Sequence, residues 1–121
     1  MVEFTLVASL LLMLLLAIIQ FGIAYSNQLQ ITDAAREGAR RAVINRTAGS
    51  AQMISSGTAA ARSSASSLNQ GLLAVTVTSA TGNWTQGDSI TVKVTYPYDI
   101  SILGLVVKSG TLSADTTMRA E

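Results

Sequence analysis

The N-terminal part of the chain is one long apolar run, and this feature limits the possible folds more than any other. Residues 4–19 read FTLVASLLLMLLLAII, and after Gln20 the run resumes over residues 21–25. A helix needs about 20 apolar residues to cross a bilayer, and the run meets that length. Because it is apolar on every face, it does not fit an amphipathic surface helix. It can rest only in a bilayer or against other copies of itself.

A cleaved signal peptide is the first alternative reading of this run. Such a peptide has a basic segment before a short apolar region, and a small-residue cleavage site after it. Here no Lys or Arg precedes the run, the run is longer than such a region, and no Ala-x-Ala site ends it. The pattern therefore favours a retained helix.

Glu3 is the one charged side chain at the beginning of this apolar segment. A carboxylate at the edge of a membrane span is costly when drawn inward, so it normally has a partner or a function. One interpretation is a solvated glutamate that interacts with the positive end of the helix dipole. The other is a charge that is used when subunits assemble.

The helix is expected to continue beyond the apolar run, to about Asn45. Residues 26–45 contain no proline, and their apolar side chains recur at helical spacing. Acidic residues precede arginines by three or four positions, which is the favourable order for helical pairs. Gly22 and Gly38 lie inside this helix, where each marks either close packing or a place where the helix can melt.

Composition excludes several classes of function. The net charge is +1 and only 12% of residues are charged, so the chain lacks the basic surface of a nucleic-acid-binding protein. It has no histidine, the commonest general base and metal ligand. It has no cysteine either, which excludes disulfides, thiol catalysis and thiolate metal sites. We therefore expect no enzymatic activity, no cofactor and no metal site.

The rest of the chain predicts a second helix and three strands. Residues 51–69 are rich in Ala and Ser and suit either a weakly amphipathic helix or a flexible linker. Period-two alternation then predicts antiparallel strands at about 72–81, 89–97 and 111–120. Pro97 either ends the second strand or restricts it to a sheet edge, and residues 98–110 are expected to form an apolar connection with a short helix or turn. The fold class is α+β: a long helix whose apolar half protrudes, and whose distal half packs on a small three-stranded antiparallel sheet.

Two loops contain candidate modification and contact residues. Asn45 and Asn83 each begin an Asn-x-Ser/Thr sequence, the acceptor pattern for N-linked sugars. Asn83 is the better candidate because its loop is bounded by glycines. Trp84 beside it either anchors a contact between subunits or folds back on its own domain.

Several of these blocks resemble one known family. The opening MVEFTLVASLLLMLLLAIIQFGIAY and the following ITDAAREGARRAV resemble the start of TadE-like pilins and pseudopilins of Tad-type pili, in the type IV filament superfamily. VKVTYPY and the closing TTMRAE are similar to that family's YPY strand and its terminal strand. The AAREGAR block and the pairing of the YPY and TMR strands make the resemblance fairly specific.

The resemblance implies a pilin-like fold and a set of partners. Residues 1–25 would form the transmembrane and filament-core half of the helix, and residues 26–121 a small globular pilin domain. The subunit would be inserted in the inner membrane, processed by a prepilin peptidase, and extracted by the pilus assembly machinery. It would then pack against identical subunits in an extracellular helical filament.

Glu3 corresponds, by its Val-Glu-Phe context, to a glutamate that this family carries at the fifth mature position. The offset of two implies that the chain begins two residues inside the mature N-terminus, or at a start that omits the leader. The resemblance implies that this carboxylate neutralises an α-amino group buried in the filament core.

The predicted function is that of a structural pilin that polymerises through its N-terminal helix for adhesion or motility. The alternative within the same family is a low-copy pseudopilin that primes or tips a filament made of another pilin. A membrane-anchored binding module that uses the small sheet is the alternative from another class. It would remain monomeric in detergent.

Overall fold

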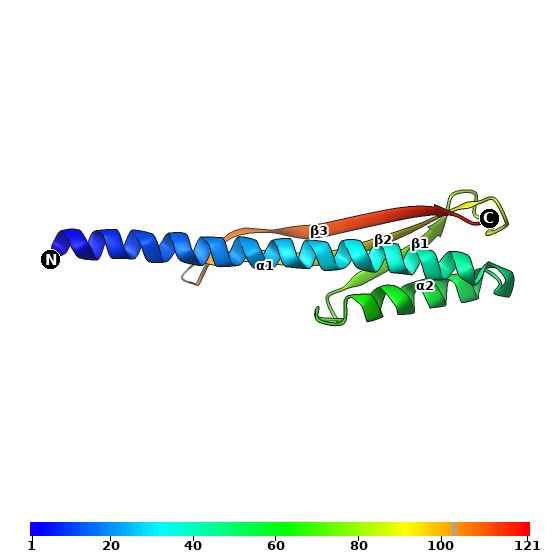
Figure 1. Cartoon of the computed structure of the whole chain (residues 1–121), viewed down its shortest axis with the longest axis horizontal. Helices are drawn as coiled ribbons and strands as arrows, with labels where there is room; N and C mark the ends of the chain where they lie inside the picture. The colour runs from blue at the N-terminus through cyan, green and yellow to red at the C-terminus, as the bar shows by residue number, and fades with distance from the viewer. Residues whose placement is uncertain (103) are drawn as a thin grey trace.

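The computed structural model describes residues 1–102 and 104–121, and it is dominated by one long helix. This helix, α1, runs from Val2 to Ile44 without a break, and its N-terminal end extends beyond the rest of the protein (Figure 1). A helix of that length measures about 65 Å. The hydroxyls of Thr5 and Ser9 donate to the carbonyl oxygens of Met1 and Leu6, at 3.1 and 2.9 Å. These two polar side chains thus find partners inside the apolar helix.

A second helix packs against the distal half of α1. A short 3-10 turn, η1 (Arg46–Ala48), reverses the chain into α2 (Ser50–Ser64). Helix α2 was expected to reach residue 69 but ends five residues earlier. The side chains that follow favour a turn: Gln70 Nε2 donates to the carbonyl oxygen of Ala65 at 2.8 Å, and Asn69 Oδ1 accepts from the Gly71 N–H at 3.0 Å. Such local side-chain bonds compete with helix continuation.

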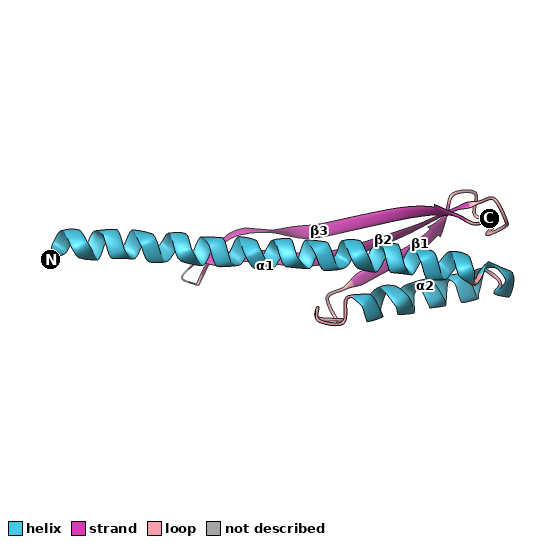
Figure 2. Ribbon diagram, viewed as in Figure 1, coloured by secondary structure: helices cyan, strands magenta, loops and turns pink. Residues whose placement is uncertain are grey.

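Three antiparallel strands form the other layer, in the order β1–β2–β3. The strands are β1 (Ala74–Ser79), β2 (Ser89–Ile102) and β3 (Leu105–Arg119). Figure 2 shows α1 and α2 side by side over this sheet, with α2 nearest β1. The predicted fold class, a long apolar N-terminal helix on a small antiparallel sheet, is confirmed.

Strands β2 and β3 are longer than the sequence pattern indicates. Residues 98–110 were expected to form an irregular connection, but the described residues of this segment extend the β2–β3 ladder from Tyr98–Gly110 to Ile102–Leu105. Leu103 lies outside the described residues. Within this segment, residues 100–107 read ISILGLVV, which are almost all apolar, so they lack the alternation by which a strand is recognised.

Pro97 lies within β2, and its position explains why the strand continues. The carbonyl oxygen of Ser89 accepts from Ala80 N–H at 2.9 Å, so the odd-numbered residues of β2 direct their backbone groups toward β1. Strand β1 begins at Ala74, opposite Thr95, and does not reach as far as Pro97. The nitrogen of Pro97 therefore faces an open edge, where the missing N–H removes no ladder hydrogen bond.

The core lies between the two layers, around the distal half of α1. It begins at Ile31 and includes small α1 side chains, Met53 and Ala61 of α2, and the inward-facing residues of the sheet: Val77, Ile90, Val92 and Val94. Burying one large aliphatic side chain contributes about 1.5–3 kcal/mol. Because so few large side chains are buried, the globular part depends on its contact with α1.

Candidate assembly surface and neighbouring sites

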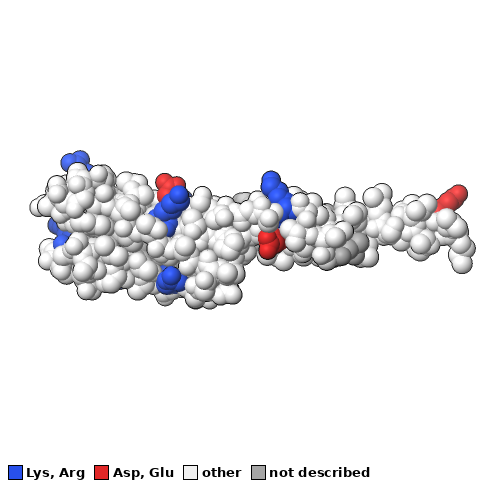
Figure 3. Space-filling model, turned by 180° about the vertical axis from the view of Figure 1, so that it is seen from behind, with Lys and Arg blue, Asp and Glu red and all other residues white. Residues whose placement is uncertain are grey.

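The first third of α1 has no packing partner among the described residues. The side chains from Val2 to Leu15 are all exposed, including Phe4 at 78%. Helix α1 is long and apolar enough to cross a membrane, and none of its most apolar window is buried. Figure 3 shows this narrow end as an uncharged surface, with an acidic side chain at its extremity. The surface is suited to lipid or to a bundle of like helices.

Glu3 lies in the first turn of α1, fully open to its surroundings. Met1 occupies the N-cap position without a side-chain cap, and the first helical bond runs from Thr5 N–H to the Met1 carbonyl oxygen at 3.1 Å. The carboxylate is therefore free to interact with the helix dipole or with a cation on another subunit. Its role in assembly stays a prediction.

Gly38 lies where α1 crosses α2. A Cβ at this position would be 2.9 Å from the Gly57 carbonyl oxygen, 3.0 Å from Ala61 Cβ and 3.1 Å from Val92 Cγ1. Gly57 mirrors it, since a Cβ there would lie 3.1 Å from Ala42 Cβ. The two helix backbones thus approach closely at a pair of glycines. Gly22, in contrast, has open space around it, and α1 is continuous through both positions.

The AAREGAR block divides its small and charged residues between two faces of α1. Ala34, Ala35, Gly38 and Ala39 are buried against α2 and the sheet, whereas the charged side chains point outward. Arg41 Nε lies 3.0 Å from Glu37 Oε1, and Arg36 is 4.0 Å from Asp33. Exposed pairs of this kind contribute about 0–1 kcal/mol. They border an open hollow of about 700 Å³ between α1 and α2, and they are available for contacts between subunits.

The loop between β1 and β2 is held together by Asp88, which is 5% exposed. Its carboxylate accepts hydrogen bonds from the hydroxyls of Ser79 and Thr81, the latter at 2.9 Å, and from the Ser89 N–H at 2.8 Å. The backbone of Asp88 also pairs with Ala120, with 2.8 Å between the Asp88 oxygen and the Ala120 nitrogen. One carboxylate thus connects the loop to both strand ends.

These bonds make the stability of the loop dependent on pH. The Ser79 hydrogen bond is the largest cause that holds the pKa of Asp88 below the ordinary aspartate value of 3.8, with further lowering by Thr81 and Ser89 against the opposing effect of burial. Because the folded pKa is lower than the unfolded one, Asp88 stabilises the fold above pH 3.8, and this contribution is lost as pH falls through the folded pKa. We expect Asp88→Asn to lower the free energy of unfolding at neutral pH and to flatten its decline in acid. Urea unfolding at several pH values tests this, with Asp115→Asn as the exposed control; an unchanged acid profile in Asp88→Asn would contradict it.

The same loop presents the two residues singled out as modification and contact candidates. Asn83 is exposed, and Trp84 is half-buried against the core with a left-handed φ of 56°. Trp84 thus folds back on its own domain, as one interpretation of the sequence held. Asn45 is half-buried at the end of α1, and its Nδ2 donates to the Arg41 carbonyl oxygen at 3.0 Å. Exposure favours Asn83 as a sugar acceptor, and modification of either residue stays a prediction.

The acidic residues of the globular part lie apart from one another. Asp99 is opposite Ser109 and Asp115 is opposite Lys93 in the β2–β3 ladder, whereas Asp88 belongs to the loop. Among residues 1–102 and 104–121, no three acidic or other ligating side chains come together in a way that would hold a metal ion.

Sequence reasoning missed Gly57, the Asp88 network and the length of the β2–β3 hairpin. The first had a recognisable signal: Ala34, Gly38 and Ala42 repeat at four-residue spacing in α1, as do Gly57 and Ala61 in α2. Small residues at that spacing allow two helices to approach closely. The Asp88 network had no such signal, because its partners come together only through the loop.

One comparison with known proteins identifies part of the chain. Residues 1–40 match the model of a family described as TadE-like protein. No curated protein and no solved structure gives a significant match. The resemblance stated from the sequence is thus confirmed over the apolar helix and the AAREGAR block, whereas the likeness of the YPY and TMR strands stays a prediction. Over residues 1–40 the chain is thus similar to the TadE-like family, which supports a protein associated with the Tad pilus, and its apolar helix is long enough to cross a membrane.

Proposed function

We propose that the chain is a structural pilin subunit of a Tad-type filament. The observation that supports this most directly is the exposure of α1 from Val2 to Leu15, in a helix that is continuous with a packed distal half. A membrane anchor alone requires an apolar span. A rigid helix that joins this span directly to the core of the globular part also allows the subunit to leave the bilayer as one body.

In this proposal the chain has two functional parts. Residues 1–25 are embedded in the inner membrane before assembly and form the helical core of the filament afterwards. Residues 26–121 form the outer domain, and the exposed charges of Arg36, Arg40 and Arg41 lie where neighbouring subunits would meet. The apolar run ends at Tyr25. In this proposal Tyr25 therefore lies at the membrane surface before assembly and at the edge of the filament core afterwards.

Electron microscopy of filaments sheared from cells that express the chain tests this proposal. We expect filaments whose main band, identified by mass spectrometry, is this chain, and no filaments when the chain is deleted. The variant Leu14→Arg tests the role of the apolar run directly, because it places a charge in the middle of that run. It should abolish assembly, since a charged residue at a bilayer centre costs about 2.5–3.5 kcal/mol or more.

Two results would contradict the proposal in different ways. Filaments that consist mainly of another pilin, with this chain in trace amounts, would assign it the pseudopilin role. A chain that stays monomeric in detergent, in cells whose surface carries no dependent filament, would instead favour a membrane-anchored binding module.

A further inference from the structure

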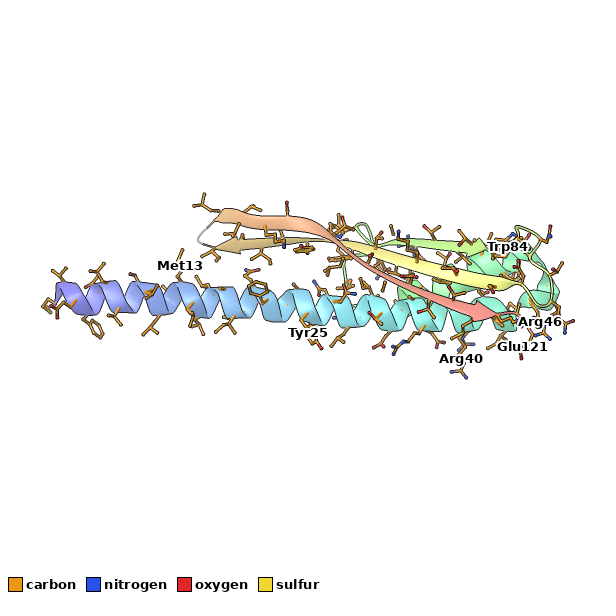
Figure 4. All side chains as sticks on the ribbon, turned by 90° about the horizontal axis from the view of Figure 1, so that it is seen from above. Met13, Tyr25, Arg40, Arg46, Trp84 and Glu121 are labelled. Carbon is orange, nitrogen blue, oxygen red and sulfur yellow. The ribbon has the colours of Figure 1, made fainter. Side chains whose placement is uncertain are left out.

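The part of the β2–β3 hairpin that extends beyond β1 is a separate feature of the molecule. We name it the hairpin arm: residues 96–102 of β2 and 105–112 of β3, with Gly104 of the turn. Strand β1 reaches no further along β2 than Thr95, so the arm is two-stranded. Figure 4 shows it continuing alongside α1 past Tyr25, toward the level of Met13. It therefore accompanies α1 into the half of the helix that has no other partner.

The end of the arm exposes apolar side chains on both of its faces. Leu105, Val106 and Val107 are 74%, 62% and 65% exposed, and consecutive residues of a strand point to opposite faces. A hairpin end in water is expected to be polar on at least one face, and docking on a single partner requires only one apolar face. Apolarity on both faces suits a medium that surrounds the hairpin, which is what lipid provides.

The position of the arm along α1 supports the same conclusion. A groove of about 300 Å³ between the two elements is lined by Phe21, Ala24 and Tyr25 of α1 and by Tyr98, Ile100 and Lys108 of the arm. Lys108 is therefore level with the end of the apolar run. Leu105 lies three residues further, about 10 Å along a strand, which equals about seven residues of helix.

Burial along α1 agrees with this estimate. Leu16 and Ala17 are half-covered, whereas Leu14, Leu15 and Ile18 on either side of them are exposed. The end of the arm thus lies on the hydrocarbon side of the level at which α1 would leave the membrane.

Aromatic and charged residues mark the level where the arm would meet the membrane surface. Tyr25 and Tyr98 line the groove with Lys108, and tyrosines are enriched at membrane–water interfaces. A lysine at this level extends its ammonium group toward the headgroups while its stem stays in apolar surroundings. Between Lys108 and the turn, the sequence carries no charge, whereas Asp99 lies just on the watery side.

The backbone of the arm limits how deep it can go. A two-stranded hairpin leaves unpaired N–H and C=O groups along both outer edges, and each is costly in hydrocarbon. The end of the arm is therefore expected to occupy the outer part of the leaflet, near the acyl carbonyls, and not the bilayer centre.

We propose that the apolar end of the hairpin arm, residues 100–102 and 104–107, inserts shallowly into the membrane leaflet on the side of the globular domain. This rests on the membrane anchoring proposed above. The arm then gives the subunit a second contact with lipid, beside α1, and fixes the rotation of the domain about the helix axis before assembly. The bilayer surface, and not a second copy of the chain, is the partner.

Single-cysteine labelling of the full chain in phosphatidylcholine vesicles tests this, because the natural chain has no cysteine. The variants Val106→Cys and Val107→Cys carry an environment-sensitive nitrobenzoxadiazole label on the two faces of the arm. Leu14→Cys reports the middle of the apolar helix, and Ser113→Cys reports an exposed position of β3 outside the arm end. Spin-labelled lipids quench either near the acyl carbonyls or near the chain ends.

We expect blue-shifted emission at Val106 and at Val107, with greater loss of intensity from the shallow quencher than from the deep one. The Leu14 label should lose more intensity to the deep quencher, and the Ser113 label should respond to neither. Quenching at Leu14 without quenching at Val106 and Val107 would overturn the insertion of the arm and leave the anchor intact. Absence of quenching at Leu14 as well would overturn the anchor itself. Shielding of only one face, dependent on protein density and insensitive to lipid quenchers, would assign the arm to a second copy and also overturn the proposal.

Discussion

Replacing Gly38 by alanine is expected to lower the free energy of unfolding of the globular part by about 1–2 kcal/mol, although the same change stabilises most helices. Alanine in an open helix gains up to about 1 kcal/mol over glycine. At Gly38 the new Cβ would lie 2.9 Å from the Gly57 carbonyl oxygen, a backbone atom that cannot rotate away. Overpacking of this kind costs about 1–3 kcal/mol, so the helices must separate.

Gly22→Ala is the matched control, since it is the same change in the same helix. Nothing lies within 4 Å of a Cβ at Gly22, so we expect stability to be unchanged or higher by up to about 1 kcal/mol. Urea unfolding in detergent, followed by the fluorescence of Trp84 against the core, measures both variants. The midpoint of thermal unfolding should fall by about 4–8 °C per kcal/mol for a domain of this size. Equal effects at the two glycines would show that the helix crossing does not depend on Gly38.

The two glycines are also expected to matter in different states of the protein: Gly38 in the single subunit, and Gly22 in the assembled one. Gly38 has its neighbours within the subunit, so its effect is expected in the isolated chain. Gly22 is exposed in the subunit, with open space around a Cβ, so any effect of packing or melting there is expected in the assembled state.

The parts of the fold that the sequence predicts are those governed by local pattern. The continuous α1 follows from the absence of proline and from helical spacing, and the inward faces of β1 and β2 follow from alternation around Val77 and Val92. The hairpin arm was not predicted because the end of the arm carries apolar side chains on both faces, and this removes the period-two signal of a strand. The end of α2 depends on side-chain bonds of Asn69 and Gln70 that compete with the helix, and propensity alone does not place them.

The candidate sites show the same difference between features set by local sequence and features set by tertiary contacts. Glu3 is identified from sequence alone, because a single charge beside an apolar run is conspicuous. The close approach of Gly38 to Gly57 requires two helices to be aligned, and the Asp88 network requires a loop to bring Ser79 and Thr81 to one carboxylate. Contacts of this kind join residues that are far apart in the sequence, so no short stretch of the chain predicts them.

Replacing Glu3 by alanine is expected to reduce the yield of filaments by a hundredfold or more, roughly, while the amount of subunit in the membrane stays unchanged. The carboxylate is exposed at the end of α1 in the single subunit, so in a membrane it would reach the aqueous interface and contribute little to stability. In a bundle of apolar helices, a neighbouring α-amino group would be a buried cation, and removal of one partner of a buried pair costs about 3–5 kcal/mol. At about 1.4 kcal/mol per tenfold change, that penalty accounts for the loss.

Glu3→Gln separates this role from the alternative, in which Glu3 only interacts with the helix dipole. Glutamine retains the size of the side chain and removes its charge. A dipole interaction is worth about 0.3–1 kcal/mol, so its loss would leave most filaments in place, whereas loss of a buried ion pair would make Glu3→Gln resemble Glu3→Ala. Asp99→Ala serves as the control, since it removes an exposed acid from the domain. Filament counts in sheared material and immunoblots of membranes give the two measurements. Normal filament yield in Glu3→Ala would show that Glu3 does not act in assembly. A parallel loss of subunit from the membrane would show the same, because a charge needed only after extraction should lower the filament count without lowering the amount of subunit in the membrane.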